Sequence, residues 1–338
     1  MKVVVTGGTG FIGSHTCLAL HQSGIEPVLL DNLSNSSSKV LDQLEKISGQ
    51  RFRFIEGDIA DAQLMQQLLQ QHQPQAVLHF AALKAVGEST RQPLRYYQNN
   101  VAATLSMLQS MQHCGVKQVV FSSSATVYGD PDYLPIDEQH PIRATSPYGW
   151  SKVMVEQLLQ DLVQADPAWL AITLRYFNPV GAHPSGLLGE SPSGIPNNLL
   201  PYIAQTAVGK RPFVSVYGAD YATKDGTGVR DYIHVMDLAH GHVAALLKLQ
   251  QQQGFHAFNL GTGQGYSVLD MLHAFAAAAG KEIPYQLVAR RPGDIASSYA
   301  DASKAQRDLN WQTLADLTDM TRDTWRWQQN YPAGLEEA

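Results

Sequence analysis

Residues 6–13 read Thr-Gly-Gly-Thr-Gly-Phe-Ile-Gly and form a glycine-rich turn between two segments of different periodicity. Before the turn, Lys2 to Thr6 is a short β-branched run, typical of a buried parallel strand. After it, Phe11 to Gln22 has helical spacing. Glycines between a strand and a helix let the backbone approach a pyrophosphate, and the N-terminus of the helix favours that negative charge. The turn therefore predicts a dinucleotide-binding unit.

An acidic residue, Asp31, follows a second apolar run, Pro27 to Leu30. About 20 residues after such a turn, a carboxylate accepts hydrogen bonds from adenosine ribose; as a purely structural residue it would cap the next loop. The same charge repels a 2′-phosphate, and no arginine follows before Arg51. We therefore expect NAD rather than NADP, with the serine-rich residues 34–38 as a loop beside the ribose and not a linker.

A tyrosine and a lysine form the second motif. Residues 146–152 read Ser-Pro-Tyr-Gly-Trp-Ser-Lys, which predicts a helix capped by Ser146 with Pro147 in its first turn. Tyr148 and Lys152 then share one helical face. The pKa of a free phenol is about 10, and an adjacent ammonium, helped by the positive nicotinamide of oxidised NAD, lowers it. An arbitrary pair would be an ordinary surface pair, but a dinucleotide fold favours Tyr148 as a catalytic base.

A third catalytic group is expected at the end of the strand before this helix. Residues 121–129 read Phe-Ser-Ser-Ser-Ala-Thr-Val-Tyr-Gly and supply it. We assign Ser124 as the hydroxyl that hydrogen-bonds the reacting oxygen. We expect Ser122 and Ser123 to satisfy only local backbone groups.

The remaining chain alternates strand-like and helical segments. Further strands are expected at 52–55, 76–80, 118–122 and 170–175. This rhythm predicts an α/β fold, a Rossmann-type doubly wound parallel sheet with its ligand at the carboxyl ends of the strands. From Pro179 to about Arg230 the chain is rich in Gly, Pro and Asn. We therefore expect an NAD-binding domain at 1–177 and a smaller mixed α/β substrate-binding domain at 178–338, with segments near 231–262 packing back onto the first.

Composition excludes several other classes of protein. The net charge of −6 over 338 residues argues against a broad nucleic-acid footprint. No apolar run reaches membrane-spanning length, and Met1 leads straight into the first strand without a signal peptide. Cys17 and Cys114 lie in helical apolar stretches, which favours packing in a reducing compartment over a disulfide or a metal site. We expect a soluble cytoplasmic protein that binds no metal.

These motifs together resemble the extended short-chain dehydrogenase/reductase family, and most closely its UDP-sugar 4-epimerases. The resemblance covers essentially the whole chain and is carried by the glycine turn, Asp31-Asn32, 80–84, 86–89, 148–152, 175–182, 195–199 and 225–235. Together with the turn and the strand-end loops, it implies NAD contacts from Gly7, Gly10, Phe11, Ile12, Gly13, Asp31, Asn32, Asn35, Ser36, Asp58, Ile59, Phe80, Ala81, Ala82, Lys84, Asn99, Ser122, Tyr148, Lys152 and Phe177.

The resemblance also implies a UDP-sugar site. Its residues are Lys84, Ser124, Tyr148, Asn178, Asn197, Asn198, Leu199, Arg230, Arg291, Asp294 and Ser298. The two arginines suit a pyrophosphate, although without the family each would pass as a surface residue. The implied reaction interconverts UDP-galactose and UDP-glucose with tightly bound NAD: Tyr148 takes the proton of the 4-hydroxyl, C4 is oxidised, the 4-keto sugar rotates and C4 is reduced on its other face.

Two alternatives to the epimerase are a nucleotide-sugar 4,6-dehydratase and a non-catalytic NAD-sensing protein. Resembling dehydratases carry Asp-Glu after the strand-end Ser or Thr, where this chain has Ala125 and Thr126. Sensors commonly lose the tyrosine or the lysine, and this chain keeps Tyr148 and Lys152. Both differences favour the epimerase.

The family resemblance also addresses substrate range and assembly. The position that limits room beside the sugar 2-substituent falls on Ser298, a small residue that admits N-acetyl sugars, so UDP-GalNAc and UDP-GlcNAc are expected as further substrates. A shift of one residue would place Tyr299 there and reverse this expectation. A homodimer is expected through 93–114 and 151–164, for which packing within one chain is the alternative.

Overall fold

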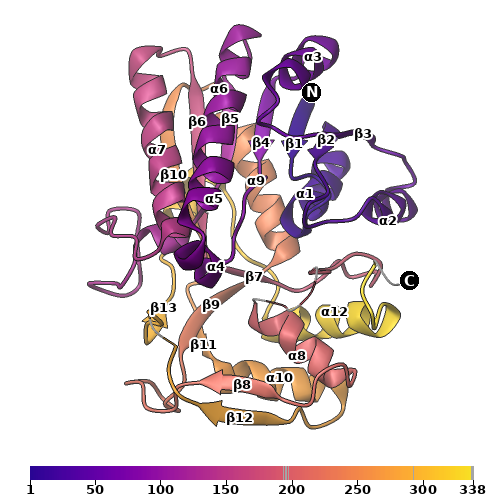
Figure 1. Cartoon of the computed structure of the whole chain (residues 1–338), viewed down its shortest axis with the longest axis vertical. Helices are drawn as coiled ribbons and strands as arrows, with labels where there is room; N and C mark the ends of the chain where they lie inside the picture. The colour runs from indigo at the N-terminus through magenta and orange to yellow at the C-terminus, as the bar shows by residue number, and fades with distance from the viewer. Residues whose placement is uncertain (193, 195, 197, 292, 336–338) are drawn as a thin grey trace.

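A seven-stranded parallel sheet forms the centre of the larger unit (Figure 1). The computed structural model describes residues 1–338 apart from 193, 195, 197, 292 and 336–338. The strand order is β10-β6-β5-β4-β1-β2-β3. Their bounds are β1 (Lys2–Thr6), β2 (Glu26–Asp31), β3 (Arg53–Glu56), β4 (Ala76–His79), β5 (Gln118–Ser124), β6 (Leu170–Tyr176) and β10 (Gly254–Leu260). The order reverses between β1 and β4, where a doubly wound sheet binds its ligand.

Helices cover both faces of this sheet because successive strand residues point to opposite sides. Val3 and Val5 of β1 pack in one core with α1 (Phe11–Gln22), α2 (Lys39–Ser48) and α9 (Val235–Leu249). Val4, between them, packs in a second core with α3 (Ala62–His72), α6 (Ala103–His113) and α7 (Pro147–Ala165). The predicted Rossmann-type fold is confirmed.

Most predicted element boundaries agree with the structure. The first strand and helix have the predicted bounds, and Ser146 caps α7 by accepting a hydrogen bond from the Gly149 amide at 3.1 Å. β5 extends two residues beyond its predicted end because residues 122–124 pair with 174–176 of β6. All three serines therefore lie within the strand.

Short helices connect β4 to α6 and β5 to α7. They are α4 (Val86–Arg91), α5 (Pro93–Tyr97), the π-helix η1 (Gln98–Ala102) and the 3-10 helix η2 (Ala125–Val127).

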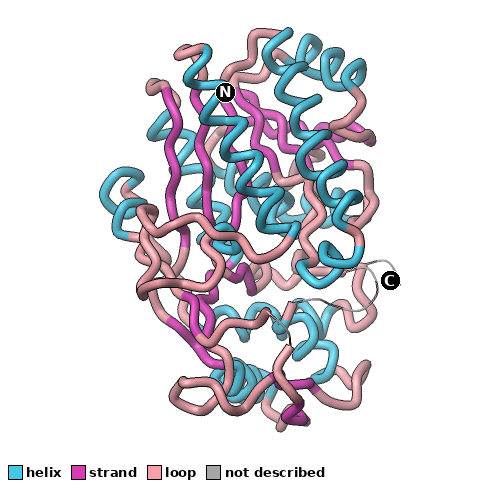
Figure 2. Tube along the Cα trace, turned by 60° about the vertical axis from the view of Figure 1, so that its left-hand side comes forward, coloured by secondary structure: helices cyan, strands magenta, loops and turns pink. Residues whose placement is uncertain are grey.

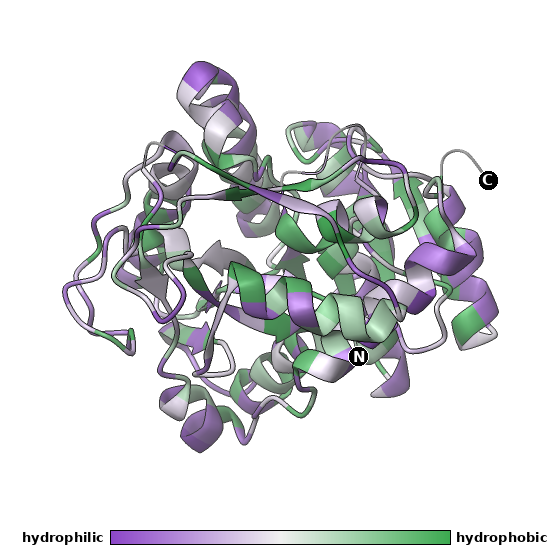
Figure 3. Ribbon diagram, turned by 90° about the horizontal axis from the view of Figure 1, so that it is seen from below, coloured by the Kyte–Doolittle hydropathy of each residue, from purple (hydrophilic) through white to green (hydrophobic). Residues whose placement is uncertain are grey.

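The smaller unit lies beyond the carboxyl ends of the central strands (Figures 1 and 2). One sheet contains β7 (Asn178–Val180), β9 (Val229–His234), β11 (Gly265–Ser267) and β13 (Ser297–Ser298), and a second pairs β8 (Val214–Tyr217) with β12 (Tyr285–Val288). The helices are α8 (Leu199–Ala207), α10 (Val268–Ala279) and α12 (Leu317–Asn330), whereas α11 (Ser303–Leu309) packs against α9 and β10 of the larger unit. Single helices of the molecule carry both hydrophobic and hydrophilic residues (Figure 3). Residues of α8, α10 and α12 share a core of their own.

The chain crosses between the two units more than once. After β9 it returns to the larger unit, where α9 packs on α1 and β10 pairs with β6 over seven residues. In α12, Met320 belongs to the smaller core, whereas Trp327 belongs to a core of the central sheet. The larger unit is thus built from several separate stretches of chain.

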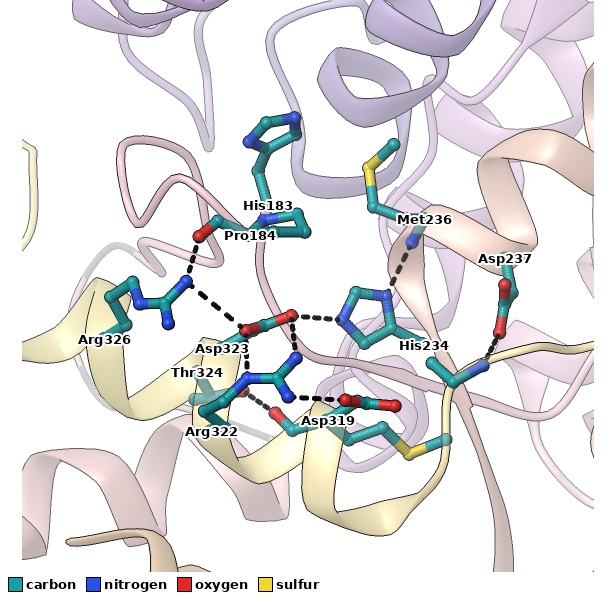
Figure 4. Close-up of polar contacts among 12 residues, drawn as sticks. His183, Pro184, His234, Met236, Asp237, Asp319, Arg322, Asp323, Thr324 and Arg326 are labelled. Carbon is teal, nitrogen blue, oxygen red and sulfur yellow. Dashed lines mark hydrogen bonds and ion pairs between the residues drawn. The ribbon is translucent and has the colours of Figure 1, made fainter.

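A contact between two buried side chains, His234 and Asp323, joins α12 to the junction of β9 and α9 (Figure 4). His234 caps α9, since its Nδ1 accepts from the Met236 amide at 3.1 Å. Its Nε2 lies 3.5 Å from Asp323 Oδ2, and Arg322 Nε donates to Asp323 Oδ1 at 3.0 Å. This contact holds the start of α9, on the larger unit, against the C-terminal helix.

Among the described residues, no helix has the length and apolar character needed to span a membrane. Outside the seven undescribed positions, no group of three or more His, Cys, Asp or Glu side chains could hold a metal ion.

Candidate functional site

A cavity of about 720 Å³ lies at the carboxyl ends of the central strands, with walls from both units. It brings together nearly every residue that the sequence places in a site. On the side of the larger unit, all twenty predicted NAD contacts line it. On the side of the smaller unit it is lined by Asn178, Asn198, Arg230, Arg291, Asp294 and Ser298.

The glycine turn is packed so tightly that side chains cannot replace its hydrogens. Gly7 has φ +69, and a Cβ there would lie 2.8 Å from the Ala81 amide nitrogen. A Cβ on Gly13 would lie 2.1 Å from the carbonyl oxygen of Gly7. Gly10 caps α1 without a side-chain hydrogen bond, which leaves the first amides of the helix to an anion. This turn fits the pyrophosphate of a dinucleotide.

Asp31 caps the following loop and also lines the cavity. Its carboxylate caps the following loop by accepting from the Leu33 amide at 2.9 Å and from Ser36 Oγ at 3.1 Å. It also accepts from the Thr9 amide at 3.1 Å and lines the cavity. The carboxylate therefore joins the glycine turn to the serine-rich loop at the place expected for the adenosine ribose.

Tyr148, Ser124 and Lys152 meet at the carboxyl end of β5. Ser124 interacts with the Tyr148 phenol as a donor that lowers the pKa of the phenol, and its Oγ accepts from the Thr126 amide at 3.2 Å. Lys152 Nζ lies 5.8 Å from the centre of the Tyr148 ring and donates to the Ser122 carbonyl at 2.7 Å. The three side chains line one cavity, as the sequence predicts.

The electrostatics of this corner differ from the sequence expectation. Burial raises the pKa of Tyr148, and the hydrogen bond from Ser124 opposes that shift. Burial also lowers the pKa of Lys152 to about 7, while the charge of Glu156 opposes that shift. Desolvation penalises the charged form of each group, and in the protein alone it outweighs the lowering of the Tyr148 pKa that we expected from Lys152.

The expectation that Ser122 and Ser123 satisfy only local backbone groups is wrong, whereas Ser122 does line the cavity. Both side chains are buried and hydrogen-bond other side chains rather than local backbone. Ser122 Oγ pairs with the Tyr176 hydroxyl, and Ser123 Oγ donates to Glu156 Oε1 at 2.5 Å. The reason is the longer β5, which directs these hydroxyls into the protein interior.

One residue that the sequence analysis missed, Glu190, joins the two walls of the cavity. Its Oε1 accepts from Lys84 Nζ at 2.9 Å and from Asn198 Nδ2 at 3.0 Å. Lys84 belongs to the predicted NAD set and Asn198 to the predicted UDP-sugar set. Glu190 lies in the Gly- and Pro-rich stretch, where no periodicity marks it.

The predicted UDP-sugar residues divide into three groups. Most line the cavity; Arg291 there pairs with Asp294 at 2.8 Å and lies over the ring of Tyr217, 4.6 Å from its centre. Leu199 instead starts α8 and packs against the core of the smaller unit. Asn197 lies outside the described residues. Tyr217 was missed, and its only signal is an aromatic residue at the end of a short strand.

The strand β13 orients Ser298 and Tyr299 differently. Ser298 pairs with Arg230 of β9 and lines the cavity. Tyr299 accepts from the Ile136 amide at 2.9 Å through its carbonyl, and its ring lies beside Gly265. In this register the small residue faces the predicted sugar pocket.

Known proteins resemble this chain over its full length. A family model described as GDP-mannose 4,6 dehydratase matches residues 4–324. The UDP-glucose 4-epimerase of Bacillus subtilis (strain 168) is 54% identical over 338 residues, which cover 100% of both chains. The chain belongs to the UDP-glucose 4-epimerase family.

Solved structures of the 4-epimerase family agree with this assignment. The UDP-glucose 4-epimerase from Bifidobacterium longum, in complex with NAD+ and UDP, has a TM-score of 0.96 and 51% identity, covering 99% of this chain and 100% of that one. The enzyme from Stenotrophomonas maltophila, with bound NAD and formylated UDP-arabinopyranose, has a TM-score of 0.96 and 52% identity, covering 98% and 99%.

Proposed function

We propose that this 4-epimerase family member interconverts UDP-galactose and UDP-glucose with tightly bound NAD. The sugar C4 is oxidised, the 4-keto sugar turns about its pyrophosphate linkage, and C4 is reduced on the opposite face. The observation that carries the proposal is the cavity itself. In it the Tyr148–Ser124 hydrogen bond of the larger unit faces Arg230 and Arg291 of the smaller unit.

The larger unit supplies the cofactor side of this site. The glycine turn and the uncapped start of α1 suit the pyrophosphate, and Asp31 suits the adenosine ribose. When bound, NAD accepts the hydride that leaves the sugar C4 and returns it to the same carbon within one cycle. Because the cycle has no net redox change, NAD need not be exchanged between turnovers.

Tyr148 is proposed as the group that takes the proton of the 4-hydroxyl and returns it later. Its hydrogen bond to Ser124 places both hydroxyls at one point in the cavity. The Lys152 ammonium stabilises the phenolate electrostatically, and its bond to the Ser122 carbonyl fixes the side chain against β5. Proton transfer and orientation are thus assigned to side chains from two neighbouring elements.

The smaller unit is proposed to hold UDP while the sugar remains free to turn. Arg230 and Arg291 are charge-assisted donors suited to the pyrophosphate, and Asn178 and Asn198 offer amides to hydroxyl groups. An anchor at the nucleotide end allows the two faces of C4 to be presented in turn. A dehydratase is disfavoured, because Ala125 and Thr126 provide no acid and base pair after Ser124.

The first test is proton NMR of the anomeric region after incubation with UDP-galactose and no added NAD. Appearance of UDP-glucose is expected, and Tyr148→Phe should abolish it with unchanged folding. Absence of conversion by the unaltered protein, persisting after NAD is supplied, would overturn the proposal. Conversion by Tyr148→Phe at an undiminished rate would remove Tyr148 from the mechanism.

We further propose that UDP-GalNAc and UDP-GlcNAc are substrates. Support comes from β13, which directs Ser298 into the cavity and turns Tyr299 toward Gly265. Ser298→Tyr should remove conversion of the N-acetyl sugars and retain that of UDP-galactose. Ser298→Thr is the matched control, since it leaves the pocket nearly unfilled. Retention of N-acetyl activity by Ser298→Tyr would refute this assignment.

A cytoplasmic homodimer is also proposed. The predicted interface segments carry exposed apolar side chains on α5, α6 and α7, namely Leu94, Leu105 and Met154. Other residues of these helices pack within the chain. One face of each helix therefore packs in the core, and the exposed face is the one proposed for the dimer interface. Light scattering should give twice the monomer mass for the unaltered protein. Met154→Glu should lower the measured mass toward that of the monomer. Both free thiols, Cys17 and Cys114, suit a reducing compartment.

A further inference from the structure

A buried ion pair lies directly behind the catalytic corner. Arg175 of β6 donates to Glu156 of α7 through Nη2 at 2.6 Å and Nε at 3.0 Å. The side chains are only 6% and 4% exposed. Neither residue lines the cavity, and the proposed mechanism uses neither. Because burying two charges is costly, such a pair invites a functional explanation.

The Glu156 carboxylate connects the elements that carry the catalytic residues. Tyr148, Lys152 and Glu156 follow one another at four-residue spacing on α7 and so share one face. Ser123, which donates to Glu156 at 2.5 Å, is the neighbour of Ser124 on β5. One carboxylate thus bonds to the strand of Ser124 from the helix of Tyr148.

The third connection runs through β6. Arg175, held by Glu156, precedes Tyr176, whose hydroxyl pairs with Ser122. Ser122 in turn accepts the hydrogen bond of Lys152 through its carbonyl. The contacts therefore form a closed ring that includes the lysine, and the Glu156–Arg175 pair completes it.

The far side of Arg175 is held away from the lysine. Arg175 Nη1 donates to the Tyr128 hydroxyl at 3.0 Å, and that hydroxyl donates to Asn259 Oδ1 at 2.6 Å. Asn259 also receives support from Glu138, which accepts from its amide at 2.7 Å. These bonds fix the guanidinium toward β10.

We propose that Glu156 is a positioning residue for the proposed 4-epimerase reaction: it holds the helix of Tyr148 against the strand of Ser124 and keeps Lys152 protonated. This inference rests on the proposed function, because it acts through Tyr148 and Lys152. It assigns a role to a residue that touches neither the cofactor nor the sugar.

The groups facing Lys152 show why its charge depends on Glu156. Burial raises the pKa of two phenols there, Tyr148 on α7 and Tyr176 on β6, so in the protein alone neither offers Lys152 a negative charge. Burial lowers the pKa of His79 on β4 to about 3, and it too is neutral. Arg175 on β6 is positive. Glu156 supplies the negative charge that opposes the effect of burial on Lys152.

The test is the pH dependence of kcat for UDP-galactose conversion by the holoenzyme carrying Glu156→Gln. Without the negative charge, Lys152 loses its proton at lower pH beside an unpaired Arg175. We expect the alkaline limb of the profile to move down by about one pH unit and kcat at pH 8 to fall about tenfold. KM should change less than about twofold. Glu156→Asp should restore most of the limb.

Two further variants make the result specific. Asp161→Asn removes an exposed carboxylate from the same helix and should leave the profile unchanged. Glu156→Gln with Arg175→Met removes both buried charges, so it tests the role if the single variant fails to fold. Its alkaline limb should still lie below that of the unaltered enzyme.

The outcomes separate this inference from the proposed function. An unaltered enzyme without conversion would overturn the proposed function and this inference with it. An active enzyme whose Glu156 variants show an unmoved alkaline limb, even with a lower kcat at every pH, would overturn the role of Glu156 alone. A downward shift reversed by Glu156→Asp supports it.

Discussion

The two walls of the cavity are built by different means. On the cofactor side, the glycine turn contacts neighbouring backbone, and the polar groups behind it are buried. On the substrate side, Arg291 has a side chain 55% exposed and bonds to Asp294, only three residues away. The first wall cannot change shape without strain, whereas side chains of the second can exchange partners when a ligand arrives. This difference suits a retained cofactor and a sugar that must turn.

The largest expected effect breaks the rigid wall. In Gly13→Ala, the new Cβ would lie 2.1 Å from the carbonyl oxygen of Gly7, so the turn must shift. We expect NAD affinity to fall at least about a hundredfold, which corresponds to about 2.7 kcal/mol. The measurement is the NAD content of purified protein, followed by titration.

Gly24→Ala is the control at the other end of the same helix. Gly24 has φ +73 but no atoms within 4 Å of a Cβ, so only a backbone cost of about 1 kcal/mol is expected. Its NAD content should be normal. Equal NAD content in the Gly13 and Gly24 variants would contradict the idea of a strained, unyielding turn.

The second prediction concerns a buried hydrogen-bonded support behind the substrate side of the cavity. Asp231, fully buried on β9, accepts from the Thr262 and Gly263 amides at 2.9 and 3.0 Å and from the Ala300 amide at 3.1 Å. Asp231→Asn replaces one accepting oxygen by an NH2 group facing a donor. We expect a loss of about 2–3 kcal/mol in the free energy of unfolding.

Denaturant unfolding and calorimetry with UDP measure the two consequences of this change. UDP affinity should fall because Asp231 fixes Ala300, which follows β13, and adjoins Arg230 on β9. The NAD content should remain. Unchanged stability and UDP affinity would show that the substrate wall needs no such buried support.

Local patterns in the sequence were sufficient for much of this molecule. The turn at 6–13 and the Tyr148–Lys152 spacing each specify a strand–helix junction, because capping, periodicity and glycine sterics act within a few residues. In a parallel sheet, the carboxyl ends of all strands lie at the same edge, so residues that follow different strands meet there. Asp31, Ser124 and Tyr148 therefore line one cavity, as predicted.

The contacts that were missed all join distant parts of the chain. Glu156 and Arg175 lie 19 residues apart in sequence, and Glu190 reaches Lys84 across 106 residues. A lone charged residue in a helix or loop has no local signature that distinguishes a buried partner from solvent. The pKa of Tyr148 was misjudged for a related reason, since desolvation depends on everything packed around the ring.

The third prediction uses histidines buried in the larger unit. Burial lowers the pKa of His15 and His79 to about 3 and that of His242 to about 4. In the unfolded chain the pKa is about 6.5. Below that pH the unfolded state binds more protons, so stability is complete above pH 6.5 and declines as the pH falls toward the folded values. By pH 5.5, each histidine should lower the free energy of unfolding by about 1.4 kcal/mol.

Thermal unfolding between pH 8 and 5 measures this decline. His242→Phe should flatten it, because the histidine Nε2 has no hydrogen-bond partner and its ring already packs against Phe80. A transition temperature that is constant over this range would contradict the assignment of neutral buried histidines. So would an unchanged slope in the variant.

The smallest effect on stability is expected on the substrate side of the cavity. A substitution there should lower activity while leaving the free energy of unfolding nearly unchanged. Arg291→Ala removes an exposed pair with Asp294, worth at most about 1 kcal/mol to folding. The same change removes the donor proposed for the pyrophosphate, so KM for UDP-galactose should rise about tenfold or more with kcat nearly unchanged. Arg290→Ala is a matched control, since Arg290 pairs with Asp220 and does not line the cavity. Equal KM values for the two variants would exclude Arg291 from UDP binding. A raised KM without a shift in transition temperature would show that the substrate side binds through side chains that the fold does not need.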